Sequence, residues 1–169
     1  MNTKRKSSSV PALSSLILVL LILLSAQAHA SEISMSRGQI VYVPAYSFIY
    51  SGDKEKPFML AVTLSIRNTD MSRKIKIYTV EYYDSKGKLA KTFMEEPVTL
   101  EPLESTRYII KSSDSTGGSG ANFIVKWESD EIVNEPIIET IMIGTQSQQG
   151  VSFTSRGKAI KELDAGADK

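Results

Sequence analysis

One stretch of strict alternation constrains the fold of this chain more than any other feature. Between residues 58 and 67, apolar side chains occupy every second position: Phe58, Leu60, Val62, Leu64 and Ile66. A period of two predicts a β-strand with one buried face and one largely exposed face. The turn-forming string Asn68-Thr69-Asp70 follows, so we expect the strand to end there.

The next apolar pattern contains an irregularity that predicts a β-bulge. Ile75 and Ile77 share one parity, whereas Tyr78, Val80 and Tyr82 share the other. One extra residue near Ile77-Tyr78 would explain the change of parity. The string Asp84-Ser85-Lys86-Gly87 then predicts a turn, and a short returning strand at 89–94 would complete a hairpin.

Short strands with frequent turn signals are expected along the rest of the chain, at 39–43, 98–100, 106–111, 121–128, 137–143 and 151–155. In the fourth of these, the inward set would be Ala121, Phe123, Val125 and Trp127. Helical periodicity is conceivable only at 156–163, and there are no crossover helices for a parallel sheet. The pattern predicts an all-β fold, a single antiparallel β-sandwich of immunoglobulin-like type.

The N-terminal segment has the three parts of a secretory signal peptide. Lys4, Arg5 and Lys6 precede an apolar run at 16–24, and the small-residue site Ala28-His29-Ala30 follows. We expect cleavage after Ala30 and a periplasmic or secreted protein without stable membrane insertion. Retention as a membrane anchor is the alternative, but the run is shorter than the roughly 20 residues that span a bilayer.

The expected organisation is therefore a signal peptide at 1–30, a lead-in at 31–38, a β-sandwich domain at 39–156 and a charged, disordered tail at 157–169.

Composition excludes most routes to catalysis. The only histidine, His29, lies in the predicted signal peptide, and the chain has no cysteine. A Ser-His-Asp triad, a cysteine nucleophile and the usual zinc sites are thereby excluded, and we predict a protein that is not an enzyme, without catalytic residues, metal or cofactor. Cleavage leaves 17 Lys+Arg against 19 Asp+Glu, a net charge of −2, so nucleic acid is not an expected partner.

Acidic residues supply the main catalytic hypothesis. Glu128, Asp130, Glu131 and Glu135 fall between two predicted strands. Two carboxylates flanking a glycosidic bond are the groups that glycoside hydrolysis needs. The alternatives are a solvated loop, or a calcium site that lacks the residue order of a known calcium loop.

A glycine-rich string is the candidate ligand-binding segment. The candidate residues are Asp114, Thr116, Gly117, Gly118, Ser119, Gly120 and Asn122. Small residues let the backbone approach a ligand, and successive N–H groups can bind an anion. The alternative is a flexible connection between strands. A second polar stretch, 144–150, would extend the surface if both lie at the same end of the sandwich.

Aromatic residues cluster ahead of the long alternating strand, at Tyr42, Tyr46, Phe48 and Tyr50. They predict either cover for the edge of the core or a binding platform.

Four strings carry a resemblance to a known family: 41–47 (VYVPAYS), 64–70 (LSIRNTD), 117–123 (GGSGANF) and 150–157 (GVSFTSRG). Over about residues 38–158 the chain resembles an uncharacterised family of exported bacterial proteins, domain of unknown function 3124. The resemblance implies a bacterial, exported, single-domain protein and supplies no catalytic residues.

These observations favour a non-enzymatic exported module that binds a protein or cell-envelope ligand through its inter-strand loops. Two alternatives remain open: a small carboxylate-dependent hydrolase acting on cell-envelope glycans, and a structural subunit that pairs through a strand edge.

Overall fold

A computed structural model describes residues 33–50, 52–146 and 149–163. Contacts divide the chain into Met1–Ile33 and Ser34–Lys169, and the strands of the described residues all belong to the second unit. The predicted signal peptide at 1–30 lies outside the described residues. Within the described ranges, no helix is long and apolar enough to cross a membrane.

Twelve strands and one short 3-10 turn, η1 (Gly52–Lys54), make up the described secondary structure. The strands are β1 (Met35–Pro44), β2 (Phe48–Tyr50), β3 (Pro57–Met59), β4 (Ala61–Arg67), β5 (Ile75–Tyr83), β6 (Leu89–Thr92), β7 (Val98–Leu100), β8 (Ser105–Ile110), β9 (Asn122–Asn134), β10 (Ile137–Gln146), β11 (Gln149–Arg156) and β12 (Lys158–Glu162).

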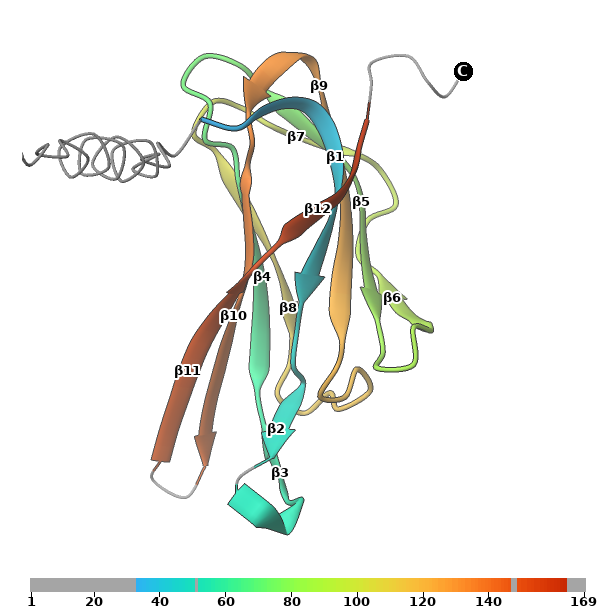
Figure 1. The fold of residues 1–169 in the computed structure, drawn as a ribbon, viewed down its shortest axis with the longest axis vertical. Helices are drawn as coiled ribbons and strands as arrows, with labels where there is room; N and C mark the ends of the chain where they lie inside the picture. The colour runs from blue at the N-terminus through green and yellow to red at the C-terminus, as the bar shows by residue number, and fades with distance from the viewer. Residues whose placement is uncertain (1–32, 51, 147–148, 164–169) are drawn as a thin grey trace, which may run out of the picture. The chain divides into compact units, whose positions relative to one another are not determined.

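The strands form three sheets in which every pairing is antiparallel (Figure 1). One sheet has the order β12-β1-β9-β5-β6, with β7 also paired to β5, and a second has the order β11-β10-β4-β8. The third is the ribbon β2-β3. The all-β, antiparallel prediction is therefore confirmed.

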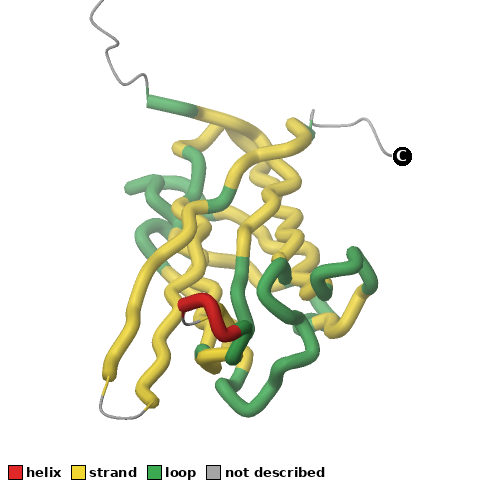
Figure 2. Tube along the Cα trace, turned by 60° about the horizontal axis from the view of Figure 1, so that its bottom comes forward, coloured by secondary structure: helices red, strands yellow, loops and turns green. Residues whose placement is uncertain are grey.

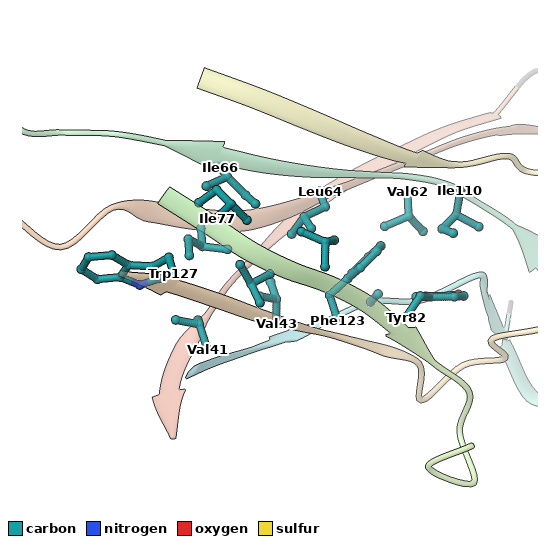
Figure 3. Packing of buried hydrophobic residues seen from close by; sticks show 14 of the residues in the cluster. Val41, Val43, Val62, Leu64, Ile66, Ile77, Tyr82, Ile110, Phe123 and Trp127 are labelled. Atoms are coloured by element: carbon teal, nitrogen blue, oxygen red, sulfur yellow. The ribbon is translucent and has the colours of Figure 1, made fainter. Parts of the chain in front are cut away.

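The two larger sheets contribute alternate residues to one hydrophobic core (Figure 3). Val62, Leu64 and Ile66 of β4 are fully buried, as the alternation predicts. Phe123, Val125 and Trp127 of β9 are also fully buried, on the inward face predicted for that strand. Each such side chain stabilises the fold by about 1.5–3 kcal/mol, so packing can replace the disulfides that the chain lacks.

The predicted bulge is confirmed. Along β5, Ile77 pairs with Trp127 of β9 and Thr79 pairs with Lys126, which leaves Tyr78 as the extra residue. The predicted hairpin is also present, since β6 returns along β5 after a turn in which Gly87 has a φ of +75°.

Three expectations about boundaries are wrong. The alternating stretch is two strands rather than one, because the chain changes from the β2-β3 ribbon to the four-stranded sheet at Leu60. Strand β9 continues to Asn134, beyond its predicted end at residue 128, so Asp130 and Glu131 lie in a strand and not in a loop.

The third wrong expectation is the structure of the C-terminal segment. Residues 158–162 form β12, which pairs with β1, where we expected a disordered tail at 157–169 or a helix at 156–163. The side chains of β12 are exposed, so backbone pairing rather than apolar burial holds the strand, and the sequence carries no apolar pattern to reveal it. Residues 164–169 lie outside the described residues.

Candidate functional site

The glycine-rich segment lies in the connection between β8 and β9, at the end of the sheets where the β2-β3 ribbon projects (Figure 1). Figure 2 turns this end toward the viewer and shows η1 among the surrounding loops. We call residues 111–121 the glycine loop.

The first half of the glycine loop is a pair of tight turns. The backbone N–H of Asp114 donates to the Lys111 carbonyl at 2.9 Å, and that of Gly118 donates to the Ser115 carbonyl at 3.1 Å. The Asp114 carboxylate accepts from both the N–H and the hydroxyl of Thr116, at 3.0 and 2.5 Å. Asp114 and Thr116, two of the predicted ligand-binding residues, are therefore partners of each other.

The second half of the glycine loop is fastened to two neighbouring segments. Both the N–H and the hydroxyl of Ser85, in the β5-β6 turn, donate to the Gly117 carbonyl at 2.9 Å. The same hydroxyl accepts from the Gly120 N–H at 2.9 Å, and the Ser47 N–H donates to the Gly118 carbonyl at 3.0 Å. Since Gly118 and Gly120 already donate inside the protein, their N–H groups are not available for an anion in this arrangement.

Close packing explains two of the glycines. A Cβ at Gly117 would lie 2.5 Å from Cζ of Tyr82 and would collide with its hydroxyl. Gly118 has a φ of +77°, and a Cβ there would lie 2.5 Å from the Ser85 hydroxyl. Only glycine fits such positions without strain. The glycine string therefore serves the packing of the loop.

Tyr82 is the buried residue on which the glycine loop rests. Its hydroxyl is 2.7 Å from that of Ser47, and both side chains are buried. Burial raises the pKa of Tyr82, so the phenol is neutral and can donate to Ser47.

Several predicted ligand-binding residues still present atoms at the surface. The Thr116 side chain is exposed, and those of Asp114, Ser119 and Asn122 are half-buried. The structure thus brings the predicted residues together in the glycine loop and the first residue of β9, but as a braced surface and not as an open anion-binding concavity.

The aromatic cluster divides between the two predicted roles. Tyr46 covers the core and contacts Phe153 edge-on, with ring centroids 5.7 Å apart. Phe48 and Tyr50 form an edge-on pair on β2 with centroids 5.5 Å apart, and Tyr50 is 52% exposed. The pair lies on the ribbon that follows Ser47, next to the glycine loop.

The second polar stretch reaches the same end of the molecule. Gly144 of β10 packs directly against Phe58, Met59 and Leu60 of the segment that includes β3. The β2-β3 ribbon therefore contacts the glycine loop through Ser47 and β10 through Phe58. Residues 147 and 148 of the stretch lie outside the described residues.

The acidic residues of the hydrolase hypothesis are dispersed among separate interactions. Glu128 is 3.0 Å from the Lys126 ammonium, and Glu131, with a side chain 68% exposed, is 2.9 Å from Nε of Arg73. Glu135 instead accepts from the Gln39 amide at 2.6 Å. These carboxylates do not form the buried pair that would support hydrolysis, and no cluster of three or more potential metal ligands occurs in the described part of the chain.

Sequence reasoning missed two polar networks. In the first, the Gln39 amide also donates to Glu162 at 2.7 Å, and the Ser36 hydroxyl donates to the same carboxylate at 2.7 Å. This network fastens β12 to β1. No local signal could have found it, because Gln39 and Glu162 are 123 residues apart in sequence.

The second missed network is a corner at residues 68–73. The buried Asn68 amide donates to the carbonyls of Arg73, Leu100 and Glu101 at 2.8–3.2 Å. The buried Asp70 carboxylate accepts from the N–H groups of Ser72, Arg73 and Asn134. The Ser72 N–H contributes most to lowering the pKa of Asp70 to about 2, against the opposing effect of burial. The string Asn-Thr-Asp predicted only a turn.

Fold and geometry together define a small all-β protein whose loops at one end are tied to one another by hydrogen bonds. Residues 38–160 match the family described as Protein of unknown function (DUF3124), and the chain belongs to this family. The match confirms the resemblance carried by the four sequence strings.

No curated protein matches the chain in sequence. Among solved structures, the chain is similar to the crystal structure of Thermotoga maritima 1070, with a TM-score of 0.44 and 14% sequence identity. The similarity covers 76% of this chain and 97% of that one.

Proposed function

We propose that this protein is a non-enzymatic binding module, exported to the periplasm or outside the cell, that recognises a protein or cell-envelope ligand through the loops at one end. In this proposal the two larger sheets form a β-sandwich of immunoglobulin-like type, an architecture that displays loops at its two ends. The sequence supports export through its predicted signal peptide, 1–30.

The observation that carries the proposal is the bracing of the glycine loop. Ser85 and Ser47 hold it at three backbone groups through four hydrogen bonds of 2.9–3.0 Å. A surface that is already ordered loses less conformational entropy when a partner binds. On β2, three residues beyond Ser47, the exposed Tyr50 supplies the kind of aromatic anchor that dominates recognition surfaces.

Thermal unfolding with a panel of envelope glycans, calcium, chelator, common anions and small solutes tests the proposal. A ligand at about 100 times its Kd adds roughly 2.7 kcal/mol, enough to raise the unfolding midpoint by several degrees. We expect the Tyr50→Ala variant to lose the shift. The matched control is Ile109→Ala on β8, because Ile109 is 49% exposed, close to the 52% of Tyr50.

The proposal fails if Tyr50→Ala keeps the full shift. If no compound shifts the midpoint, a photocrosslinker placed at Tyr50 or at Ile109 in the periplasm takes the place of the panel. The proposal then expects a crosslinked partner from position 50 and none from position 109, and equal crosslinking at both would overturn it. The export step is tested by sequencing the N-terminus of the periplasmic protein, which is expected to begin at Ser31.

A further inference from the structure

Two exposed apolar side chains lie at the corner formed by residues 68–73. Among the described residues of the unit that holds the strands, Met71 and Leu103 are the most exposed large apolar residues, at 81% and 64%. Their backbone segments are bonded, because the Leu103 N–H donates to the carbonyl of Asp70, the residue before Met71, at 3.2 Å. A single exposed apolar residue is ordinary, but here two are placed on adjoining segments. We call them the apolar pair.

Leu103 occupies a backbone position that usually belongs to glycine. Residues 101–104 form a turn in which the Glu104 N–H donates to the Glu101 carbonyl at 3.0 Å, and Pro102 comes before Leu103. The φ of Leu103 is +62°, and a turn with proline second and a positive φ third normally has glycine or asparagine there. Leucine is disfavoured in this conformation because its Cβ crowds the backbone. Residues held in this way cluster at functional sites, and burial does not explain this leucine.

The Asn68 network fixes this turn against the corner. The Asn68 side-chain amide donates to the carbonyls of Leu100 and Glu101, at 3.2 and 3.0 Å, where the turn begins. The Asn68 backbone N–H donates to the Glu104 carbonyl at 2.9 Å, where the turn ends. The apolar pair is therefore presented by an ordered surface, which loses less conformational entropy when a partner binds.

A hollow of about 240 Å³ adjoins the apolar pair. Ser72, which follows Met71, and Pro102, which precedes Leu103, both line it. The other lining residues are Arg73, Lys74, Glu101, Ser129, Asp130 and Glu131. The hollow is thus polar, with apolar side chains at its border.

Carboxylates outnumber cations around this hollow. The Arg73 guanidinium is shared between two of them, since it lies 2.9 Å from Glu131 and 3.9 Å from Asp70. With Glu104 beside the turn and Arg37 bonded to the Asp130 carbonyl, the surroundings hold five carboxylates, Asp70, Glu101, Glu104, Asp130 and Glu131, and three cations, Arg37, Arg73 and Lys74. The net negative charge favours a positively charged partner.

The same charge disfavours a lipid surface. Exposed apolar loop residues can insert into membranes, but anionic phospholipids attract basic segments and repel acidic ones. A protein segment that combines apolar and basic side chains satisfies both the apolar pair and the carboxylates.

We propose that the apolar pair and the adjoining hollow bind a polypeptide segment of a partner protein, in which apolar side chains are flanked by lysine or arginine. The apolar side chains would cover Met71 and Leu103, and a basic side chain would enter the hollow toward Glu101 and Asp130. Strand β5 separates this surface from the glycine loop, since its nine residues span about 30 Å between the corner and the turn at Ser85 (Figure 1). Either surface can fail without the other.

Three seven-residue peptides test the proposal by titration into the protein, expressed as the full chain and observed by its backbone amide NMR shifts. The probe is Lys-Ser-Leu-Ser-Leu-Ser-Lys, whose leucines and lysines share one face when it is extended. One control replaces both leucines by serine, and the other replaces both lysines by glutamate. We expect the probe to shift the amides of Met71 and Leu103, and both controls to bind about tenfold more weakly or not at all.

Leu103→Gly removes the apolar side chain and the backbone strain together. Glycine adopts a positive φ freely, so the unfolding midpoint should stay the same or rise. The probe should nevertheless bind about tenfold more weakly, because an apolar contact is lost. Glu55→Gly is the matched control, since Glu55, between η1 and β3, is the other described non-glycine residue with a positive φ, +46°. Its affinity for the probe should stay within about twofold.

A pair of double variants tests the charge. Glu101→Gln with Asp130→Asn removes two exposed carboxylates and should weaken the probe severalfold, with a smaller dependence on salt. Asp53→Asn with Glu55→Gln removes the same charge at the β2-β3 ribbon and should change neither quantity.

The inference is overturned if the probe does not bind at millimolar concentration, or if either control peptide binds equally well. It is also overturned if Leu103→Gly lowers the unfolding midpoint and keeps the full affinity, which would mean that the leucine serves the fold alone. Vesicles of phosphatidylglycerol and phosphatidylethanolamine should not bind, and binding of the vesicles in place of the probe would assign the surface to a membrane.

Discussion

The corner at residues 68–73 and the glycine loop hold polar segments against strands by opposite means. In the corner, the buried side chains of Asn68 and Asp70 make the contacts. In the glycine loop, the backbone makes them, and the missing side chain at Gly117 lets the chain rest on Tyr82.

Similar polar strings can therefore have unlike physical roles. In the string Asn-Thr-Asp, side-chain hydrogen bonds hold the corner together, so replacing one donor or acceptor atom is expected to destabilise it. In the string Gly-Gly-Ser-Gly, the backbone packs closely against Tyr82 and Ser85, so an added side-chain atom at Gly117 or Gly118 would clash. Three substitutions test whether the two segments differ in this way.

The largest effect is expected from Gly117→Ala. The new Cβ would lie 2.5 Å from Cζ of Tyr82, which is buried and hydrogen-bonded to Ser47 and therefore cannot move aside easily. Overpacking of this kind costs about 3 kcal/mol. Urea unfolding measures the loss as a lower midpoint with an unchanged slope.

Gly150→Ala is the matched control for that experiment. No atom lies within 4 Å of a Cβ built at Gly150, so the same substitution should change stability by less than about 0.5 kcal/mol. If the two variants are equally stable, the absence of a side chain at Gly117 is not needed for the packing of the glycine loop. The contrast with the corner then disappears.

An intermediate effect, dependent on pH, is expected from Asp70→Asn. The pKa of Asp70 is lowered from 3.8 to about 2 in the folded protein, so its stabilising contribution is present above pH 4. That contribution is lost as the pH falls from about 4 toward 2. The variant should be less stable than the wild type at pH 7, and the difference should shrink toward pH 2.

Thermal unfolding at several pH values measures this convergence. The exposed Asp53→Asn variant is the control and should follow the wild type throughout. Asp84, whose pKa is lowered chiefly by the Lys88 N–H, titrates in all three proteins and cancels in the comparison. A stability difference that does not change between pH 7 and pH 2 would show that the charge of Asp70 is unimportant to the corner.

Elements with a periodic burial pattern could be predicted from the sequence. The alternation ending at Arg67 predicted the buried face of β4, and the change of parity after Ile77 predicted the bulge, because both follow from the two-residue period of a strand. The sequence could not give the long-range polar contacts, since partners such as Gln39 and Glu162 are distant in sequence.

Strand β12 and the candidate site show why the rest could not be predicted. Strand β12 buries no apolar side chain, so no periodic signal marks it, and it depends on Gln39 and Ser36 of β1, which are more than 120 residues away in sequence. The glycine loop was correctly located as a loop, but its packing depends on Ser85 and Tyr82, which belong to β5 and the turn after it.

The smallest effect is expected from Ser85→Ala. The hydroxyl donates to the Gly117 carbonyl and accepts from the Gly120 N–H, both at 2.9 Å and both near the surface, where water can replace it. The loss should be about 1 kcal/mol, and Ser112→Ala, an exposed residue of the same loop, should cost almost nothing. Urea unfolding of both variants makes the comparison.

Hydrogen exchange tests whether the Ser85 hydroxyl also orders the glycine loop, beyond its small contribution to stability. If it braces the loop, the Gly120 amide should exchange faster in Ser85→Ala, while the Gly118 amide, bonded to the Ser115 carbonyl within the loop, should change less. Equal acceleration at both amides would mean that the glycine loop moves as one unit. No acceleration at either amide would instead mean that the loop is ordered by Gly117 resting on Tyr82, and that side-chain bonds matter only in the corner.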